Sequence, residues 1–298
     1  MENLKTNKKP VIQYGMLLGG LILMLVLSLL PYSVIDYDGK LKTGLGFFNA
    51  VLNLDGNDIS TVYRVLTIAG MTILDFVFII AAILAVIFAI IDLVKTLKTK
   101  DFESRLDYMK ENYFKALVPG VMAVVINAIL GSDIAVFAVI IMAIALLIPS
   151  ACVLLNGEMD KKRIIKTTAI AFVGVFAFLM TLAVSKECSL DTALHSRYDI
   201  VTHLSAWVNI ILGIVTVFAV HSQKYLVRDE ENPSMYTKVV LLITTVITLL
   251  ALIFGAVSGL VTTGGIVVLV VGLLLIGSVT CKYWIPAFQK NDNQPLAA

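Results

Sequence analysis

The stretch VLTIAGMTILDFVFIIAAILAVIFAII, from Val65 to Ile91, decides the fold class. It carries a single charged residue, Asp75. A helix of about 20 apolar residues crosses the hydrocarbon core of a bilayer, so this run can span a membrane with length left for tilt. Similar apolar runs recur along the chain, and we expect an all-α polytopic membrane protein with about eight transmembrane helices. The expected spans cover residues 11–31, 65–94, 113–131, 134–155, 164–185, 204–221, 239–258 and 265–285.

The composition agrees with a chain that lives in lipid. Hydrophobic residues make up 59% of the sequence and charged residues 15%, whereas a soluble domain is about a quarter charged. No basic run with interleaved aromatic residues is present, so nucleic acid is not an expected partner. The expected surroundings are the lipid bilayer and other membrane protein subunits.

The distribution of Lys and Arg predicts the orientation. If the N-terminus is inside, the inner segments hold 18 of the 23 basic residues. The largest groups lie at 95–115 and 161–166. Because inner loops are enriched in Lys and Arg, both termini are predicted to be cytoplasmic, in the plasma membrane. We use "inner end" below for the end of each helix on this predicted cytoplasmic side.

The order of loops suggests an internal repeat. Each half contains a span, a longer outer loop, a span, a polar inner loop and then a tight hairpin of two spans. This pattern predicts two parallel four-helix membrane units, 11–157 and 158–286, between a cytoplasmic N-terminus (1–10) and a cytoplasmic tail (287–298). Transporters show repeats of this kind, and so do simple duplications of a helical bundle.

Two polar segments have patterns of their own. In the first outer loop, Asp38-Gly39 separates two short alternating runs, which predicts a small β-hairpin. In the first polar inner loop, Phe102, Leu106, Met109 and Tyr113 follow helical spacing. That stripe fits either an amphipathic helix lying on the inner leaflet or a helical extension of the second span.

Three polar side chains within the spans are candidates for function. Asp75 is costly to bury in a bilayer, by about 2.5–3.5 kcal/mol on insertion scales, so it needs a polar partner or a role in proton or cation transfer. Asn127 and Asn209 are the strongly polar amides within spans, and such groups also serve to bond one helix to another. Convergence of the three on a water-accessible cavity would favour transport, whereas a packed interior would favour a structural role.

Small residues mark possible helix contacts. Gly15 and Gly19, and likewise Gly255 and Gly259, have the four-residue spacing that lets two helices approach closely. Packing within the bundle is one use of this spacing, and contact with a partner helix is the other.

The second outer loop contains a ladder of possible metal ligands. Asp191, His195, Asp199 and His203 follow Glu187 at intervals of four residues, so neighbours share one helix face. His and Asp at this spacing can bind zinc, but the ladder twists and at most three members could share one ion. We expect a solvated acidic face and no metal site, and no cofactor is expected elsewhere.

Enzyme motifs are absent from the sequence. It contains no glycine-rich phosphate loop, no His-Glu-x-x-His and no Gly-x-Ser-x-Gly. We therefore expect a non-catalytic subunit or assembly partner of a membrane complex. A transporter or channel for a small ion or solute is the alternative.

Overall fold

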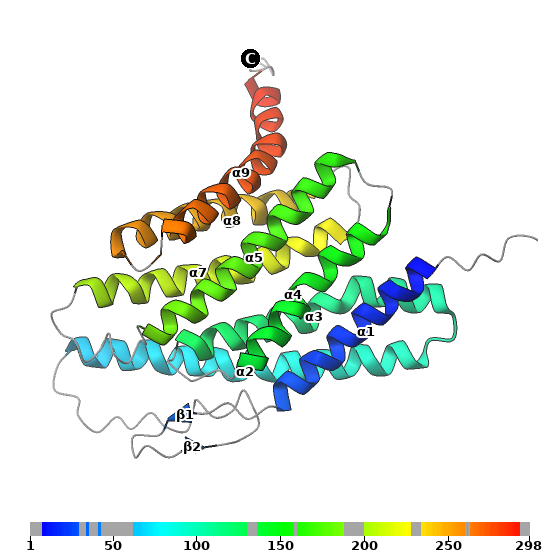
Figure 1. Cartoon of the computed structure of the whole chain (residues 1–298), viewed down its shortest axis with the longest axis horizontal. Coiled ribbons are helices and arrows are strands. Elements are labelled where there is room, and N and C mark those ends of the chain that lie inside the picture. The colour runs from blue at the N-terminus through cyan, green and yellow to red at the C-terminus, as the bar shows by residue number, and fades with distance from the viewer. Residues whose placement is uncertain are drawn as a thin grey trace, which may run out of the picture.

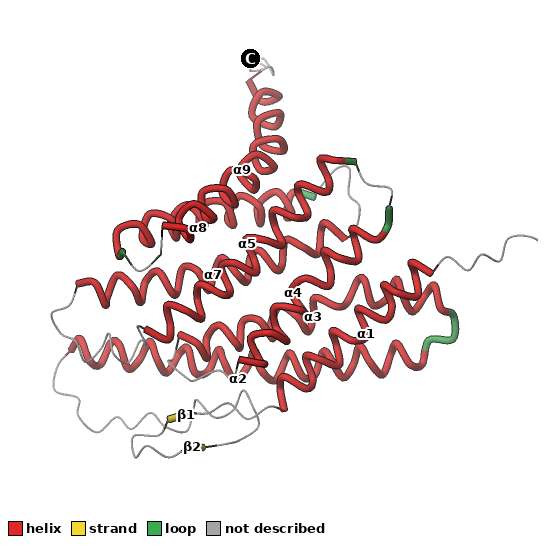
Figure 2. Tube along the Cα trace, viewed as in Figure 1, coloured by secondary structure: helices red, strands yellow, loops and turns green. Residues whose placement is uncertain are grey.

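The computed structural model describes residues 8–29, 34–35, 41–42, 62–129, 136–157, 160–187, 200–227, 234–259, 261 and 263–292. These residues form eight α-helices and two very short strands, and helices account for nearly all of the described chain (Figure 2). The helices are α1 (Lys8–Leu29), α2 (Val62–Lys98), α3 (Phe102–Ile129), α4 (Val136–Leu155), α5 (Lys161–Glu187), α7 (Ile200–Val227), α8 (Met235–Ser258) and α9 (Thr263–Asp292).

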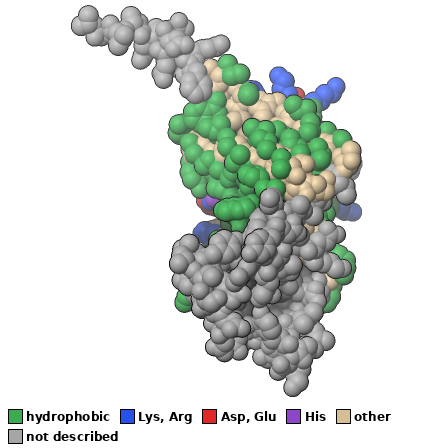
Figure 3. Space-filling model, turned by 90° about the vertical axis from the view of Figure 1, so that its left-hand side faces the viewer, with side chains coloured by type: hydrophobic (Ala, Val, Ile, Leu, Met, Phe, Trp, Pro, Cys, Tyr) green, Lys and Arg blue, Asp and Glu red, His purple; other side chains and the backbone are tan. Residues whose placement is uncertain are grey.

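All eight helices are long and apolar enough to cross a membrane. The expected multi-pass helical architecture is therefore confirmed in its number of spans. Many large apolar side chains lie on the outside of the bundle, as lipid-facing residues do. On the described surface seen in Figure 3, apolar side chains predominate and Lys and Arg lie at the edge.

Successive helices run back and forth across one layered bundle (Figure 1). The longest is α2, with 37 residues. At 1.5 Å per residue this is about 55 Å, well beyond the roughly 30 Å of a hydrocarbon core. Figure 1 shows that the turn between α2 and α3 lies at the same end of the bundle as the start of α1.

Helix α3 is the centre of the bundle. It packs on α1, α2, α5 and α7, and it has the largest buried share of the eight spans. Its neighbour α2 presents a stripe of buried small residues, Ala82, Ala85 and Ala89. Small side chains let the two helix backbones approach closely, which favours packing in lipid, where no hydrophobic effect drives helices together.

The start of α3 corrects one interpretation of the polar inner loop. Leu106, Met109 and Tyr113 are buried inside the bundle, and the ring of Phe102 lies 5.4 Å from that of Tyr14 on α1. A separate amphipathic helix on the leaflet is therefore wrong, and so is an extension of the second span, because α2 ends at Lys98 and the stripe belongs to α3. The apolar stripe packs on other helices, because α3 begins at Phe102 and continues without a break into the span.

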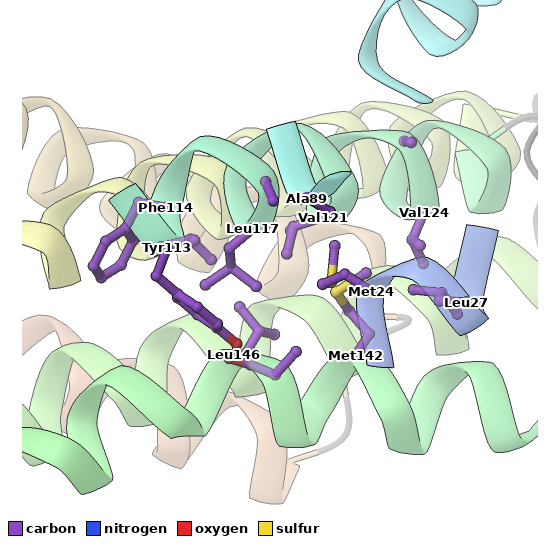
Figure 4. Packing of buried hydrophobic residues seen from close by; sticks show 14 of the residues in the cluster. Met24, Leu27, Ala89, Tyr113, Phe114, Leu117, Val121, Val124, Met142 and Leu146 are labelled. Atoms are coloured by element: carbon purple, nitrogen blue, oxygen red, sulfur yellow. Dashed lines mark hydrogen bonds between the residues drawn. The ribbon is translucent and has the colours of Figure 1, made fainter. Parts of the chain in front are cut away.

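Buried apolar side chains form two clusters. One combines α1 to α4 with Phe178 of α5 and Val220 of α7, and Figure 4 shows part of it around Tyr113, Met24 and Leu146. The other comes from α5, α7, α8 and α9. Helix α3 packs on α5 and α7, and α4 does the same. These contacts do not support two separate four-helix units, because the two halves share a packed interface.

The first outer loop contributes little regular structure to the described chain. Strand β1 (Val34–Ile35) pairs antiparallel with β2 (Leu41–Lys42), with Val34 opposite Lys42. Two residues per strand do not support the expected hairpin, and its Asp38-Gly39 turn lies outside the described residues. Helices therefore define the described fold.

Candidate functional site

The three polar candidates from the sequence are placed on three different helices. Asp75 belongs to α2, but its side chain lies outside the described part of the chain. Asn127 lies near the end of α3 and is fully buried. Asn209 is 1% exposed and lies in α7, where it contacts α5. The structure thus places two of the three in the packed interior.

Asn209 bonds one helix to another. Its Nδ2 donates to the Oγ of Ser185 on α5 at 2.6 Å, and Ser185 donates in turn to the carbonyl of Thr181 at 2.6 Å. All three side chains are buried. Interhelical amide and hydroxyl bonds of this kind are worth roughly 0.6–2 kcal/mol in a bilayer. This hydrogen bond holds α5 and α7 together, and we call such an interhelical bond a helix clamp.

The glycines at four-residue spacing do not mark contacts between the described helices. A Cβ built on Gly15 or Gly19 would meet nothing within 4 Å. Gly259 has φ 67° at the end of α8, where a left-handed residue ends the helix. A Cβ on Gly255 would lie 2.8 Å from Val261 Cγ2, in the turn that follows α8. A partner helix against Gly15 and Gly19 stays a prediction.

The residue next to this motif makes the close contact that the spacing suggested. A Cβ on Gly20 would run into the hydroxyl of Tyr113 and would lie 2.8 Å from Ile148 Cδ1. Gly20 thus lets α1 approach α3 and α4 together. The Gly-x-x-x-Gly spacing identifies a helix rich in small residues, but it does not tell which face of that helix is turned inward.

The predicted metal ladder cannot be placed. Asp191, His195 and Asp199 lie outside the described residues, and so do the side chains of Glu187 and His203, although α5 and α7 contain their backbones. The expectation of no metal site stays a prediction.

The sequence places Tyr113 in the apolar stripe of the polar inner loop, but it does not predict the structural role of the Tyr113 hydroxyl. Pro149 has no backbone N–H, so it leaves the carbonyl of Ala145 without its helical partner. The Tyr113 hydroxyl donates to that carbonyl at 3.0 Å. An unpaired carbonyl is costly in a bilayer, so this bond from α3 repairs the proline break in α4. We call Gly20, Tyr113, Ala145 and Pro149 the tyrosine junction.

A second clamp joins the inner ends of α1 and α4. The Nε2 of Gln13 donates to the carbonyl of Cys152 at 2.7 Å and also to Oδ1 of Asn156. Lys9 Nζ lies against Gly157, where a Cβ would come within 2.5 Å of it. The last carbonyls of a helix lack partners within it, and a cation near that end is favourable. Helix α1 therefore caps the end of α4.

Asp92 is a residue that sequence reasoning missed. It is 2% exposed, and its Oδ1 accepts a 2.9 Å bond from the hydroxyl of Tyr108. Its Oδ2 and the hydroxyl of the buried Thr96 have no hydrogen-bond partner among the described residues. The positive charges of Lys115 and Lys95 interact electrostatically with this carboxylate. We call Asp92, Thr96 and Tyr108 the acidic site.

A sequence signal for the acidic site exists. Asp92 continues the stripe of Ala82, Ala85 and Ala89 at helical spacing, and that stripe faces α3. A carboxylate in register with the small-residue face of a span is directed into the bundle. The signal is easily missed because Asp92 lies at the end of the apolar run, next to the polar loop.

The described interior therefore combines interhelical hydrogen bonds with several buried polar atoms that have no hydrogen-bond partner among the described residues, including Asp92 Oδ2, Asn209 Oδ1 and Gln223 Nε2. No family model matches the chain, and neither a curated protein nor a solved structure matches it.

Proposed function

We propose that this chain is a non-catalytic integral membrane protein that acts as a subunit or assembly partner of a membrane complex. The observation that carries the proposal is the bond from Asn209 to Ser185. An amide that could have lined a transport path is used to join α5 and α7. Gln13 and Tyr113 likewise direct their donors to carbonyls of α4.

The topology belongs to the same proposal. Both termini lie in the cytoplasm and the membrane is the plasma membrane, as the 18 basic residues of the inner segments suggest. The halves 11–157 and 158–286 are two parallel four-helix units that are fused into one bundle. The two apolar clusters support this division, and the helix contacts between the clusters support a fusion of the two halves.

The surface for a partner is the outward side of α1 that carries Gly15 and Gly19. Neither glycine is in close contact with the rest of the described chain. Small residues on an outward helix face allow a second helix to approach, and in lipid such packing drives association.

Quantitative capture from native membranes tests this proposal. A C-terminally tagged chain is solubilised in mild detergent and its partners are counted by mass spectrometry, with an unrelated multi-pass protein as the control. At least one other membrane protein should be recovered in a fixed ratio to the chain. Gly15→Leu combined with Gly19→Leu should reduce that recovery without lowering the thermal unfolding midpoint. Recovery of the chain alone, in repeated mild conditions, would contradict the proposal.

A transporter or channel for a small cation is the second candidate. The acidic site favours it, because Asp92 is a buried carboxylate with an oxygen that has no partner among the described residues. Ionisable residues inside membrane spans commonly mark ion pathways. The two candidates differ in whether loss of the Asp92 charge changes an ion flux.

A further inference from the structure

A cationic and aromatic cluster lies between the inner ends of α5 and α9. Lys166 Nζ donates to the hydroxyl of Tyr283 at 2.6 Å and lies 4.7 Å from the centre of that ring. Lys282 Nζ lies 5.8 Å from the same ring. Two ammonium groups from two helices therefore surround one tyrosine. An ammonium has three N–H donors, and the Tyr283 hydroxyl occupies one donor of Lys166.

The end of α9 is held in place by α8. Trp284 Nε1 donates to the carbonyl of Lys238 at 3.1 Å, and Thr280 bonds Thr245 at 2.9 Å one turn earlier. Helix α9 is thus tied to α5 through Tyr283 and to α8 through Trp284. The ammonium groups of Lys166 and Lys282 are carried on a fixed framework instead of a free tail.

The start of α5 adds positive charge to the same edge. Lys161, Lys162 and Arg163 occupy its first turn, which contains no acidic residue. The N-terminus of a helix is itself positive, so these three cations add to the positive potential of this edge, where Asp160, the residue directly before the helix, is the nearest acidic residue in the sequence. Lys162 and Arg163 precede Lys166 by four and three residues, so they share its side of the helix.

Exposed apolar side chains border these cations. Ile165 is 53% exposed and Ile285 is 51% exposed. Each follows a lysine of its own helix by three residues, Lys162 and Lys282 respectively, so each shares a helix face with a cation. Tyr and Trp at the end of a span mark the membrane interface, where headgroups meet acyl chains. A ligand for this edge needs a negative group at the height of the cations and a hydrocarbon part alongside Ile165 and Ile285.

We propose that this α5–α9 edge, made of Lys166, Lys282, Tyr283, Ile165 and Ile285, binds an anionic phospholipid of the inner leaflet. The headgroup phosphate accepts hydrogen bonds from Lys166 and Lys282, and the acyl chains lie against the two isoleucines. Basic clusters at the cytoplasmic ends of transmembrane helices bind anionic lipid headgroups, at about 1 kcal/mol per Lys or Arg. This inference rests on the proposed orientation, in which both termini are cytoplasmic, and it does not depend on whether the chain is a subunit or a transporter.

Native mass spectrometry of the delipidated full chain tests the proposal. Phosphatidylglycerol or phosphatidylcholine is titrated into the protein in detergent, and the lipid-bound fraction is measured. Wild type should bind phosphatidylglycerol more tightly than phosphatidylcholine. Lys166→Gln with Lys282→Gln should weaken phosphatidylglycerol binding about tenfold or more, since two charges are lost. Phosphatidylcholine binding should not change.

A matched control removes two charges elsewhere on the inner side. Lys98→Gln with Lys100→Gln changes two exposed lysines at the α2–α3 turn and should leave phosphatidylglycerol binding unchanged. Lys166→Arg with Lys282→Arg keeps both charges and should retain most of the binding, which also shows that the edge tolerates substitution. Equal loss in the control pair, or no loss in the glutamine pair, would overturn the site.

Inorganic phosphate separates a lipid site from a general anion site. Phosphate at millimolar concentration should not compete with phosphatidylglycerol, because it lacks the hydrocarbon part that packs on the isoleucines. Full displacement by phosphate would overturn the assignment to a phospholipid.

Discussion

The tyrosine junction and the acidic site both use the inner half of α3, yet they differ in how completely their polar groups are bonded. In the tyrosine junction, the hydroxyl of Tyr113 pairs with the one carbonyl that Pro149 leaves open. In the acidic site, Tyr108 satisfies one oxygen of Asp92, and the other has no partner in the described chain. A buried polar group whose hydrogen bond is made, such as the Tyr113 hydroxyl, indicates a structural role. A buried carboxylate oxygen without a partner, as in Asp92, is where a charge-dependent activity would reside.

The largest expected effect comes from filling the space at Gly20. Gly20→Val would drive methyl groups into the Tyr113 hydroxyl and Ile148, and overpacking of this kind costs about 3 kcal/mol. Gly19→Val is the matched control, because a Cβ there meets nothing within 4 Å. Thermal unfolding in detergent should show a large drop for Gly20→Val and almost none for Gly19→Val. Equal drops would mean that α1 does not dock through Gly20.

Removing one oxygen from the tyrosine junction should have a smaller effect. Tyr113→Phe keeps the ring and leaves the Ala145 carbonyl without a donor, at a cost of about 1–3 kcal/mol. The double variant Tyr113→Phe with Pro149→Ala restores an N–H to α4. If the hydroxyl serves to repair the proline break, adding Pro149→Ala to the Tyr113→Phe variant should recover part of the lost stability. No recovery in the double variant would separate the hydroxyl from the proline.

The acidic site should tolerate loss of its charge better than the junction tolerates loss of its hydroxyl. Asp92→Asn retains an acceptor for Tyr108, so the unfolding midpoint should stay near that of wild type. Asp92→Leu removes the acceptor, but Tyr108 is only half-buried and can bond water, so we expect a cost below about 1 kcal/mol. A collapse of Asp92→Leu to the level of Gly20→Val would mean that the acidic site is as structural as the junction.

The smallest effect concerns the start of α3. Asp101 lies in the turn before the helix, where its Oδ2 accepts bonds from Ser104 N and Oγ, each at 3.0 Å. The bond from the Ser104 backbone N–H, followed by that from its hydroxyl, lowers the pKa of Asp101. A lowered folded pKa stabilises the helix start above the unfolded value of about 3.9, and this is lost as pH falls through the lowered value.

Hydrogen exchange at the first amides of α3 measures this effect. Asp101→Ala should speed exchange near neutral pH and should make no difference at pH values well below the lowered pKa, where the wild-type carboxyl is protonated. An equal effect of Asp101→Ala at both pH values would show that the charge of this cap is irrelevant.

The sequence predicts the number and the approximate bounds of the helices, because each apolar run must hide its backbone polar groups within a helix. It misses the ends that continue past the hydrocarbon core. Hydropathy predicts the third span at 113–131, whereas α3 begins at Phe102, since Leu106 and Met109 pack inside the bundle. Hydropathy does not distinguish a polar helix turn packed on protein from a loop.

The contacts that define the sites depend on register between helices that are distant in sequence. Tyr113 reaches Ala145 because of the axial offset between α3 and α4. No local sequence pattern encodes that offset. The same holds for Gly20, which a spacing rule passes over in favour of Gly15 and Gly19. The sequence predicts Asn209 as a polar residue within a span, but its partner Ser185 becomes evident only when α5 and α7 are placed side by side.

The most direct test of a structural interior against a conducting one is ion flux in proteoliposomes. The purified chain is reconstituted with a pH-sensitive or sodium-sensitive dye inside, alongside Asp92→Asn and Asp75→Asn and protein-free vesicles. If the interior polar groups serve to hold helices together, all three proteins should match the protein-free vesicles. A proton or cation flux in wild type that disappears in either asparagine variant, with the unfolding midpoint unchanged, would contradict the assembly role and establish a carboxylate-dependent transport path.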